Sequence, residues 1–226
     1  MNYFFLTLLF FTHFQQPTIL IPAHLDDNKK MVSISRGAAV YITPVKGGGH
    51  GTGTYVKIGD AYLIITAKHV TSGHSEYFVT AGKKTAIAKK VFESKNKDIS
   101  VLAVNELNGV DPIDLTKFKG CKLSPGDTVL FSGYPGNYSL MTTRAFISGE
   151  MGSTRYLQGL AWFGSSGSGV INEDGKLCGV LTAIGVERKG FHSHTLETLN
   201  YIHILEKGDL LRIAETTMEG NTINEK

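Results

Sequence analysis

Hydrophobic positions in this chain come in short runs separated by glycine and polar residues, from about residue 38 onward. Runs of this length and spacing are typical of β-strands joined by tight turns. The first six runs are 38–45, 54–58, 62–66, 77–80, 85–92 and 99–104. Six more follow at 129–134, 142–147, 155–162, 169–172, 177–183 and 198–203. The pattern therefore predicts two groups of six strands.

Three further segments complete this prediction. The turn-rich, weakly patterned segment 105–125 separates the two groups and is expected to connect them. Asp174-Gly175 lies between two runs, where Asp-Gly favours a β-hairpin turn. Segment 205–216 has helical spacing of its apolar residues and predicts a closing helix. The expected fold class is all-β, built from barrels or sandwiches in two halves of similar architecture.

Composition narrows the class of protein. The chain has 226 residues, of which 42% are hydrophobic and 19% charged, so it can bury a real core. The net charge of +3 is small and the basic residues are scattered, without the Arg-rich or aromatic-interleaved stretch of a nucleic-acid binder. No CxxC or His-rich spacing indicates a metal site, and nothing indicates a cofactor. Cys121 and Cys178 either pair or remain separate buried thiols.

The N-terminus differs from the rest of the chain. Residues 3–14 are almost entirely apolar, a length that suits a signal-peptide core better than a membrane span of about 20 residues. No basic residue precedes Lys29. Three interpretations are open: a secretory signal, a membrane-associated anchor, or a true start at Met31. We expect residues 1–30 to be a signal or anchor with a linker, and the protein to be secreted, periplasmic or membrane-associated.

Three residues in distant segments could together carry chemistry. His69 follows an apolar strand, Asp98 opens another, and Ser166 lies between glycines. Taken singly, each has a structural explanation: a core histidine, a turn aspartate, a flexible Gly/Ser turn. A serine hydroxyl, however, needs a base within reach, and the base needs an orienting partner. Because all three occur in the order His, Asp, Ser, they predict nucleophilic catalysis.

The same segments resemble the motifs of trypsin-like serine peptidases. Thr66-Ala67-Lys68-His69-Val70 resembles their Thr-Ala-x-His motif, and Asp98-Ile99-Ser100-Val101-Leu102 resembles their Asp-Ile-Ala-Leu-Leu motif. Gly164-Ser165-Ser166-Gly167-Ser168-Gly169-Val170 is similar to Gly-(Asp/Asn)-Ser-Gly-Gly-Pro-Leu. The segments 51–56 and 179–183 also resemble the strands before the histidine and after the serine. The resemblance covers residues 38–201, and the short intervals fit compact bacterial or viral branches, including HtrA-like enzymes.

This resemblance implies a particular fold. It is two six-stranded antiparallel Greek-key barrels with a C-terminal helix. Residues 31–120 would form the barrel that carries His69 and Asp98. Residues 121–226 would form the barrel that carries Ser166, together with the helix. The chain ends soon after that helix, so we expect no PDZ domain.

The resemblance also implies roles for single residues. Ser166 would attack a peptide carbonyl, His69 would take its proton, and Asp98 would hold the imidazole. The backbone N–H groups of Gly164 and Ser166 would form the oxyanion hole. The strand residues Leu181, Thr182 and Ala183 would pair with the substrate backbone. The expected partner is a polypeptide substrate and not nucleic acid. If the N-terminus is an anchor, it would associate the protein with a membrane.

Two departures from the family pattern change the expected specificity and regulation. Ser165 stands where trypsin-like zymogens carry an aspartate, so activation through a freed N-terminus is not expected. Leu160, at the usual base of the specificity pocket, and Ala161 beside it are not acidic, so we expect an apolar or small P1 side chain. Alternatively, His192 or His194 reaches the pocket and favours glutamine or glutamate; otherwise both lie on an exposed loop.

Other candidates fit less well. Ser168 stands where the family usually has glycine and is expected to be structural, while His50 and His74 fit no motif and are expected on the surface. Ser168 also occupies the position of the last glycine in Gly-x-Ser-x-Gly, which argues against an α/β-hydrolase. The serious alternative is a non-catalytic binding or scaffolding protein with the trypsin fold.

Overall fold

The computed structural model describes residues 24–136, 138–189 and 192–223. The predicted N-terminal signal or anchor, apart from its last residues, lies outside this part of the chain. Among the described residues, no helix is long and apolar enough to cross a membrane.

The first barrel is built from six antiparallel strands. They are β1 (Ala39–Pro44), β2 (Gly51–Ile58), β3 (Ala61–Thr66), β4 (Glu76–Ala81), β5 (Lys84–Glu93) and β6 (Ser100–Ala103). Their order is β1-β4-β5-β6-β3-β2, and pairing of β1 with β2 closes the barrel. The short strand β7 (Ile113–Asp114) adds to β2 in parallel. All six predicted runs are therefore strands, as the period of the hydrophobic pattern indicated.

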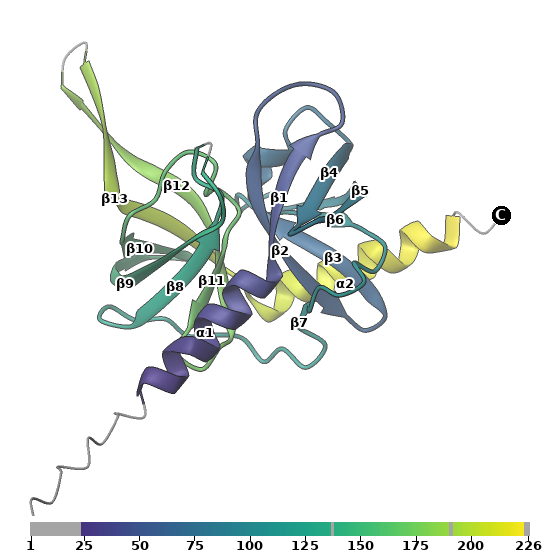
Figure 1. Ribbon diagram of the computed structural model, residues 1–226, viewed down its shortest axis with the longest axis horizontal. Helices are drawn as coiled ribbons and strands as arrows, with labels where there is room; N and C mark the ends of the chain where they lie inside the picture. Colours follow the sequence, from purple (N-terminus) through teal and green to yellow (C-terminus); the bar gives the residue numbers. More distant parts are fainter. Residues whose placement is uncertain (1–23, 137, 190–191, 224–226) are drawn as a thin grey trace, which may run out of the picture.

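The second barrel closes in the order β10-β13-β12-β11-β8-β9. Its strands are β8 (Thr128–Gly133), β9 (Met141–Met151), β10 (Thr154–Gln158), β11 (Gly169–Asn172), β12 (Leu177–Lys189) and β13 (His192–Ile204). Figure 1 shows the two barrels side by side, the first in blue and the second in green. The predicted fold of two six-stranded barrels is confirmed. The Asp174-Gly175 turn is also confirmed, with Gly175 at a φ of 77°.

The structure differs from the predicted elements at three places. The run 155–162 is a strand only as far as Gln158, after which the chain leaves the sheet. Strands β12 and β13 continue to the pair Lys189–His192 and form a hairpin that projects from the barrel (Figure 1). The predicted N-terminal linker contains helix α1 (His24–Ala38), and our sequence analysis predicted no helix there.

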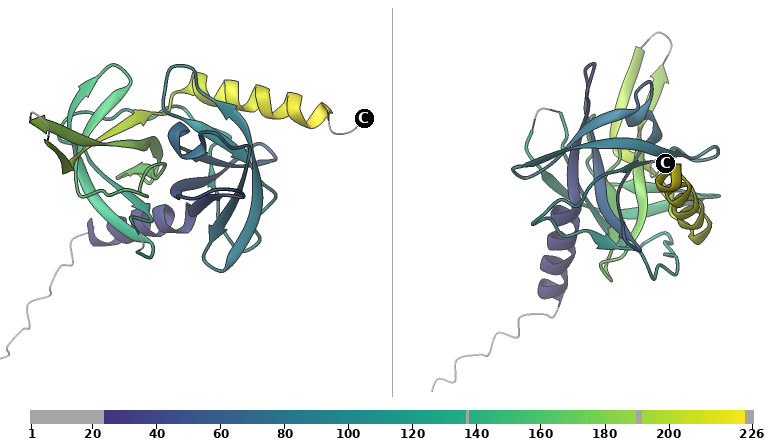
Figure 2. Two further views of the ribbon diagram at one scale, coloured as in Figure 1. Left: turned by 90° about the horizontal axis from the view of Figure 1, so that it is seen from above. Right: turned by 90° about the vertical axis from the view of Figure 1, so that its right-hand side faces the viewer.

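Both helices cover the junction between the barrels. The predicted closing helix is confirmed as α2 (Lys207–Ile223), which extends beyond its predicted end. Each barrel has its own apolar core, and a third cluster joins residues of both barrels to Met31 of α1 and to Leu210 and Ile213 of α2. Figure 2 shows the two helices on opposite sides of the barrel pair. Burial of this shared cluster therefore favours one relative placement of the barrels.

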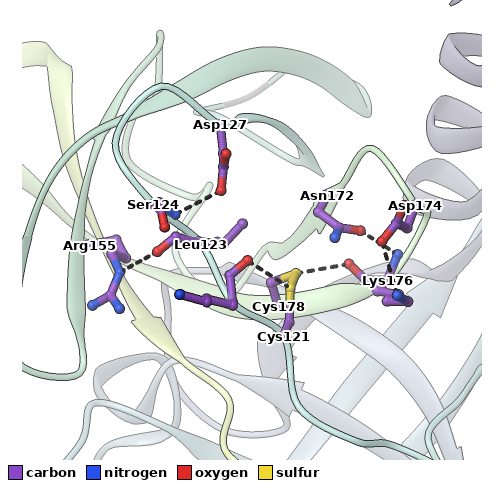
Figure 3. Close-up of a disulfide and its surroundings, with 10 residues drawn as sticks. Cys121, Leu123, Ser124, Asp127, Arg155, Asn172, Asp174, Lys176 and Cys178 are labelled. Carbon is purple, nitrogen blue, oxygen red and sulfur yellow. Dashed lines mark hydrogen bonds and ion pairs between the residues drawn. A yellow bond between two sulfur atoms is a disulfide. The ribbon is translucent and has the colours of Figure 1, made fainter.

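A disulfide resolves the two alternatives for the cysteines. Cys121 in the connector between the barrels bonds to Cys178 of β12, with their Cα atoms 5.0 Å apart (Figure 3). Cys178 is fully buried in the core of the second barrel. The disulfide thereby attaches the connector to that core.

Replacing both cysteines with alanine should lower stability. The two residues are 57 positions apart, and closing a loop of this size contributes about 4 kcal/mol through the entropy of the unfolded chain. We expect urea unfolding to show a loss of that order, and a reductant to destabilise the wild type but not the double variant. Equal stability of the wild type with and without reductant would contradict the pairing.

Candidate active site

The three predicted catalytic residues meet where the two barrels face each other. His69 lies in a 3₁₀ turn (Lys68–Thr71) directly after β3, and Asp98 ends the turn before β6. Ser166 comes from the second barrel, in the loop between β10 and β11. His69 and Ser166 line one cavity of about 290 Å³ together with Gly164. The structure therefore brings together residues that are up to 97 positions apart in sequence.

Asp98 holds His69 through both of its carboxylate oxygens. Oδ2 lies 2.7 Å from His69 Nδ1, and Oδ1 accepts the backbone N–H of His69 at 3.0 Å. A carboxylate only accepts, so Nδ1 carries the proton and Nε2 keeps its lone pair. Burial raises the pKa of Asp98, but the hydrogen bonds and charge of His69 outweigh it and keep this pKa below its usual value. The carboxylate is therefore ionised at neutral pH and can stabilise an imidazolium.

Two glycines give the serine loop its shape. Gly164 and Gly167 have φ angles of 96° and 92°, which side chains rarely tolerate. A Cβ atom at Gly164 would also collide with His50 and with the carbonyl of Tyr134, and one at Gly167 would collide with the carbonyl of Thr52. Within the described part of the chain, the N–H groups of Gly164 and Ser166 donate to no acceptor. Both N–H groups are thus available to a ligand in the cavity.

The serines of this loop differ in their hydrogen bonds. Ser168 is fully buried and its hydroxyl donates to the carbonyl of Ser165 at 2.7 Å, as expected of a structural serine. Ser165 is also buried, and its N–H donates to the carbonyl of Trp162 at 2.9 Å. The Ser166 hydroxyl bonds to no other described residue and faces the cavity shared with His69. Hydrogen bonds between nucleophile and base are often long before substrate binds.

The fold and this geometry agree with the comparison to known proteins. Residues 51–180, more than half of the chain, match the family model of the trypsin-like peptidase domain. This chain belongs to the trypsin-like peptidase domain family. It is accordingly a serine endopeptidase. Among curated proteins, none matches it.

Solved structures of similar fold are HtrA-type and other bacterial proteases. AlgW, an HtrA-type protease solved with a tripeptide, has a TM-score of 0.67 at 20% identity, over 85% of this chain and 64% of its own. The Rv3671c protease from M. tuberculosis in its active form has a TM-score of 0.63 at 22% identity, over 78% and 80%. The serine endoprotease from Yersinia pestis has a TM-score of 0.63 at 22% identity, over 85% and 65%. At this identity the likeness concerns the fold.

One predicted substrate contact of this peptidase needs correction. Leu181 is buried, its N–H donates to the carbonyl of Ser168 at 2.9 Å, and its carbonyl accepts from Gly167 at 2.7 Å. Its backbone N–H is therefore used by the serine loop and does not pair with a substrate strand. Thr182 is buried and donates to the carbonyl of Tyr201, whereas Ala183 is exposed. Of the three predicted residues, only Thr182 and Ala183 remain candidates for pairing with a substrate backbone.

Leu160 and Ala161 lie beside a second, uncharged cavity. Leu160 is exposed and Ala161 is buried, and both line a cavity of about 350 Å³ whose wall includes Ser165. The remaining lining residues are Phe131, Gly133, Pro135, Tyr138, Met141, Thr143 and Trp162. This cavity lies on the β8–β9 side of the loop and does not include residues 181–183.

Histidines that sequence analysis placed on the surface also border the site. His50 is half-buried: it stacks on Tyr41, and its Nε2 lies 3.0 Å from the carbonyl oxygen of Tyr134, to which it donates. His74 is exposed but lines the Ser166 cavity as well. His192 and His194 lie in β13, in the paired hairpin rather than on a loop. No local signal marks His50, because its partner is 84 positions away.

Thr52 of β2 is the main contact of the serine loop with the first barrel. Its hydroxyl donates to the carbonyl of Gly164 at 2.7 Å and accepts the N–H of Tyr134 at 3.0 Å. Its backbone N–H donates to the carbonyl of Ser166 at 2.8 Å. Thr52 is fully buried, so water cannot replace these bonds.

The described residues include no group of three or more His, Cys, Asp or Glu that could bind a metal ion.

Replacing Thr52 with valine should destabilise the protein and slow its reaction. The change leaves the carbonyl of Gly164 and the N–H of Tyr134 without a buried partner, at about 2–3 kcal/mol. Thr52→Ser keeps the hydroxyl and is the matched control. Urea unfolding and the rate of labelling by a fluorophosphonate measure the two effects. If valine and serine variants behave alike, the hydroxyl does not hold the loop.

Proposed function

We propose that Ser166, His69 and Asp98 form the catalytic triad of this serine endopeptidase. The observation that carries the proposal is the double hydrogen bond from Asp98 to His69, which orients the ring beside a cavity shared with Ser166. A carboxylate held in this way fixes the tautomer of the imidazole that a general base requires. The two unused N–H groups of the serine loop support the same assignment.

The reaction follows from these positions. The Ser166 oxygen attacks the scissile carbonyl while His69 Nε2 takes the hydroxyl proton, and Asp98 stabilises the resulting imidazolium. The N–H groups of Gly164 and Ser166 stabilise the oxyanion. The intermediate then breaks its C–N bond, His69 gives its proton to the leaving amine, and an ester to Ser166 remains. Water, deprotonated by His69, hydrolyses this ester and restores the serine.

The proposed P1 preference is for apolar or small side chains. The proposal rests on residues 160–163, the segment before the serine, which carry no charge. A Lys or Arg side chain would be desolvated there without a carboxylate partner, which is unfavourable. We also propose that Thr182 and Ala183 carry the backbone of the bound substrate, because Ala183 is exposed at that edge.

A non-catalytic binding role is the second candidate. The unbonded hydroxyl of Ser166 is the observation that favours it, since a binding protein needs no contact between serine and histidine. A scaffold, however, gives no reason for Asp98 to hold His69 by both oxygens. The geometry therefore favours the peptidase.

We further propose that the protein works outside the reducing cytosol. Structural disulfides persist mainly in oxidising compartments, and Cys121–Cys178 has one end buried in a core. The apolar segment 3–14 agrees with export or membrane association.

Covalent labelling tests the triad directly. A fluorophosphonate should modify the wild type at Ser166, identified by peptide mass spectrometry, and should not modify Ser166→Ala. Asp98→Asn should slow labelling by about 10⁴-fold because the imidazole loses its orienting carboxylate. Ser168→Ala is the control for the neighbouring serine and should still be labelled. A folded wild type that resists labelling would favour the binding protein.

A peptide library tests the P1 preference. Cleavage should occur after apolar or small residues, with little after Lys or Arg. Leu160→Asp should add cleavage after Lys or Arg if this residue faces the P1 side chain, and Leu160→Asn controls for the loss of the apolar group. Cleavage by the wild type after basic residues would show that another acidic group serves the pocket.

A further inference from the structure

His203 of β13 contacts the candidate active site at the backbone of Asp98. Its neighbours Ile202 and Ile204 are buried in the core of the second barrel, so strand alternation directs His203 outward. There its Nδ1 accepts the backbone N–H of Asp98 at 3.0 Å. Asp98 is therefore bonded by His69 on its carboxylate and by His203 on its backbone. The two bonds come from different barrels.

We propose that His203 is a positioning residue for Asp98, and that protonation of His203 releases Asp98 and lowers activity in acid. The inference rests on the proposed triad, in which Asp98 orients His69. His203 itself touches no substrate. Its role would be to fix the turn that carries Asp98 to the barrel that carries Ser166.

The bond from Asp98 to His203 exists only while the imidazole is neutral. Neutral histidine has one ring nitrogen that accepts and one that donates, whereas the imidazolium donates from both. Since Nδ1 accepts here, Nε2 carries the proton. A proton added to Nδ1 would face the N–H of Asp98, so the bond would be lost and the two groups would repel each other. The geometry thus makes this contact sensitive to pH.

Charged groups from the neighbouring elements face His203. The carboxylate of Asp98 and the ammonium of Lys97 lie on the turn before β6, and Asp209 lies on α2. The side chain of Lys97 is 9% exposed, and its Nζ bonds to the carbonyl of Ile204 at 3.0 Å, to Glu206 at 3.0 Å and to Asp209 at 2.7 Å. From the adjacent strands, Val180 of β12 and Thr154 of β10 pair with His203 and are uncharged.

These surroundings favour the neutral ring. Burial lowers the pKa of His203 most, the charge of Asp98 opposes this, Lys97 lowers the pKa further and Asp209 raises it. The pKa is lowered overall. The folded protein then binds fewer protons than the unfolded chain as the pH falls below the ordinary histidine value of about 6.5. Stability is lost from that pH down through the lowered pKa, in the direction in which Asp98 is released.

Lys97 explains why release of Asp98 would not separate the barrels. It fixes the same turn to β13 and α2 by three bonds that involve no histidine. Within the turn, Ser94 accepts the N–H of Lys97 and donates its own N–H to the carbonyl of Ile99. Loss of the His203 bond would therefore loosen the backbone at Asp98 while the turn stays attached. The expected consequence is altered activity in a folded protein.

Two variants distinguish the role of His203 as a hydrogen-bond acceptor from its role as a titrating group. Asparagine at position 203 offers Oδ1 as an acceptor and does not titrate, whereas leucine offers no acceptor. At pH 8, His203→Asn should label with fluorophosphonate at nearly the wild-type rate, and His203→Leu roughly tenfold or more slowly, in line with an unsatisfied N–H. In acid, the wild-type rate should fall more steeply with pH than the rate of His203→Asn, because the variant has no titrating ring at position 203.

Nuclear magnetic resonance provides a readout that needs no activity. The amide proton of Asp98 should show a titration in the wild type and in Ser166→Ala that is lost in His203→Asn. If this titration is found but the wild type neither labels nor cleaves, His203 controls Asp98 and the proposed function is wrong. If the wild type labels but the amide titration and acid slope are the same in His203→Asn, the inference is overturned and the proposed function stands.

Discussion

The candidate site depends on hydrogen bonds that cross from one barrel to the other. His69 and Asp98 belong to the first barrel and Ser166 to the second, so no single barrel can place a base beside a nucleophile. On the serine side these bonds are made by Thr52 of the first barrel. Its hydroxyl bonds to the carbonyl of Gly164 and to the N–H of Tyr134, and its N–H bonds to the carbonyl of Ser166. These are short bonds in a fully buried place, where an unpaired group is costly. The relative position of the barrels is therefore fixed at the point where the chemistry requires it.

The aspartate side of the site is joined to the second barrel by charge. The side chains of Lys97 and Asp209 are only 9% and 4% exposed, and both are hydrogen-bonded. A buried pair of this kind adds little net stability, but removing one partner leaves an uncompensated charge. Through this pair, helix α2 fixes the turn before β6 in the first barrel. Asp209, in the first turn of helix α2, binds the ammonium of Lys97, which is the residue before Asp98.

Sequence analysis located the elements and segments whose signals are local. Alternating short runs predicted the strands, and glycines around Ser166 predicted a loop with unusual backbone angles. The partners of these segments could not be predicted, because Thr52 is 112 positions from Gly164 and Asp98 is 105 from His203. Pairing of Cys121 with Cys178 depended on the same kind of distant contact. Leu181 was misassigned for a related reason: motif position showed that it lies near the serine but not that the serine loop already bonds its N–H.

The two connections between the barrels differ in their dependence on pH. Thr52 holds the serine loop through a hydroxyl and backbone groups, none of which titrates between pH 4 and 9. Asp98 is held across the barrels by His203, whose ring accepts its N–H only while the ring is neutral. If these residues have the roles proposed above, protonation of His203 would loosen the backbone at Asp98 while Thr52 keeps its bonds to the serine loop.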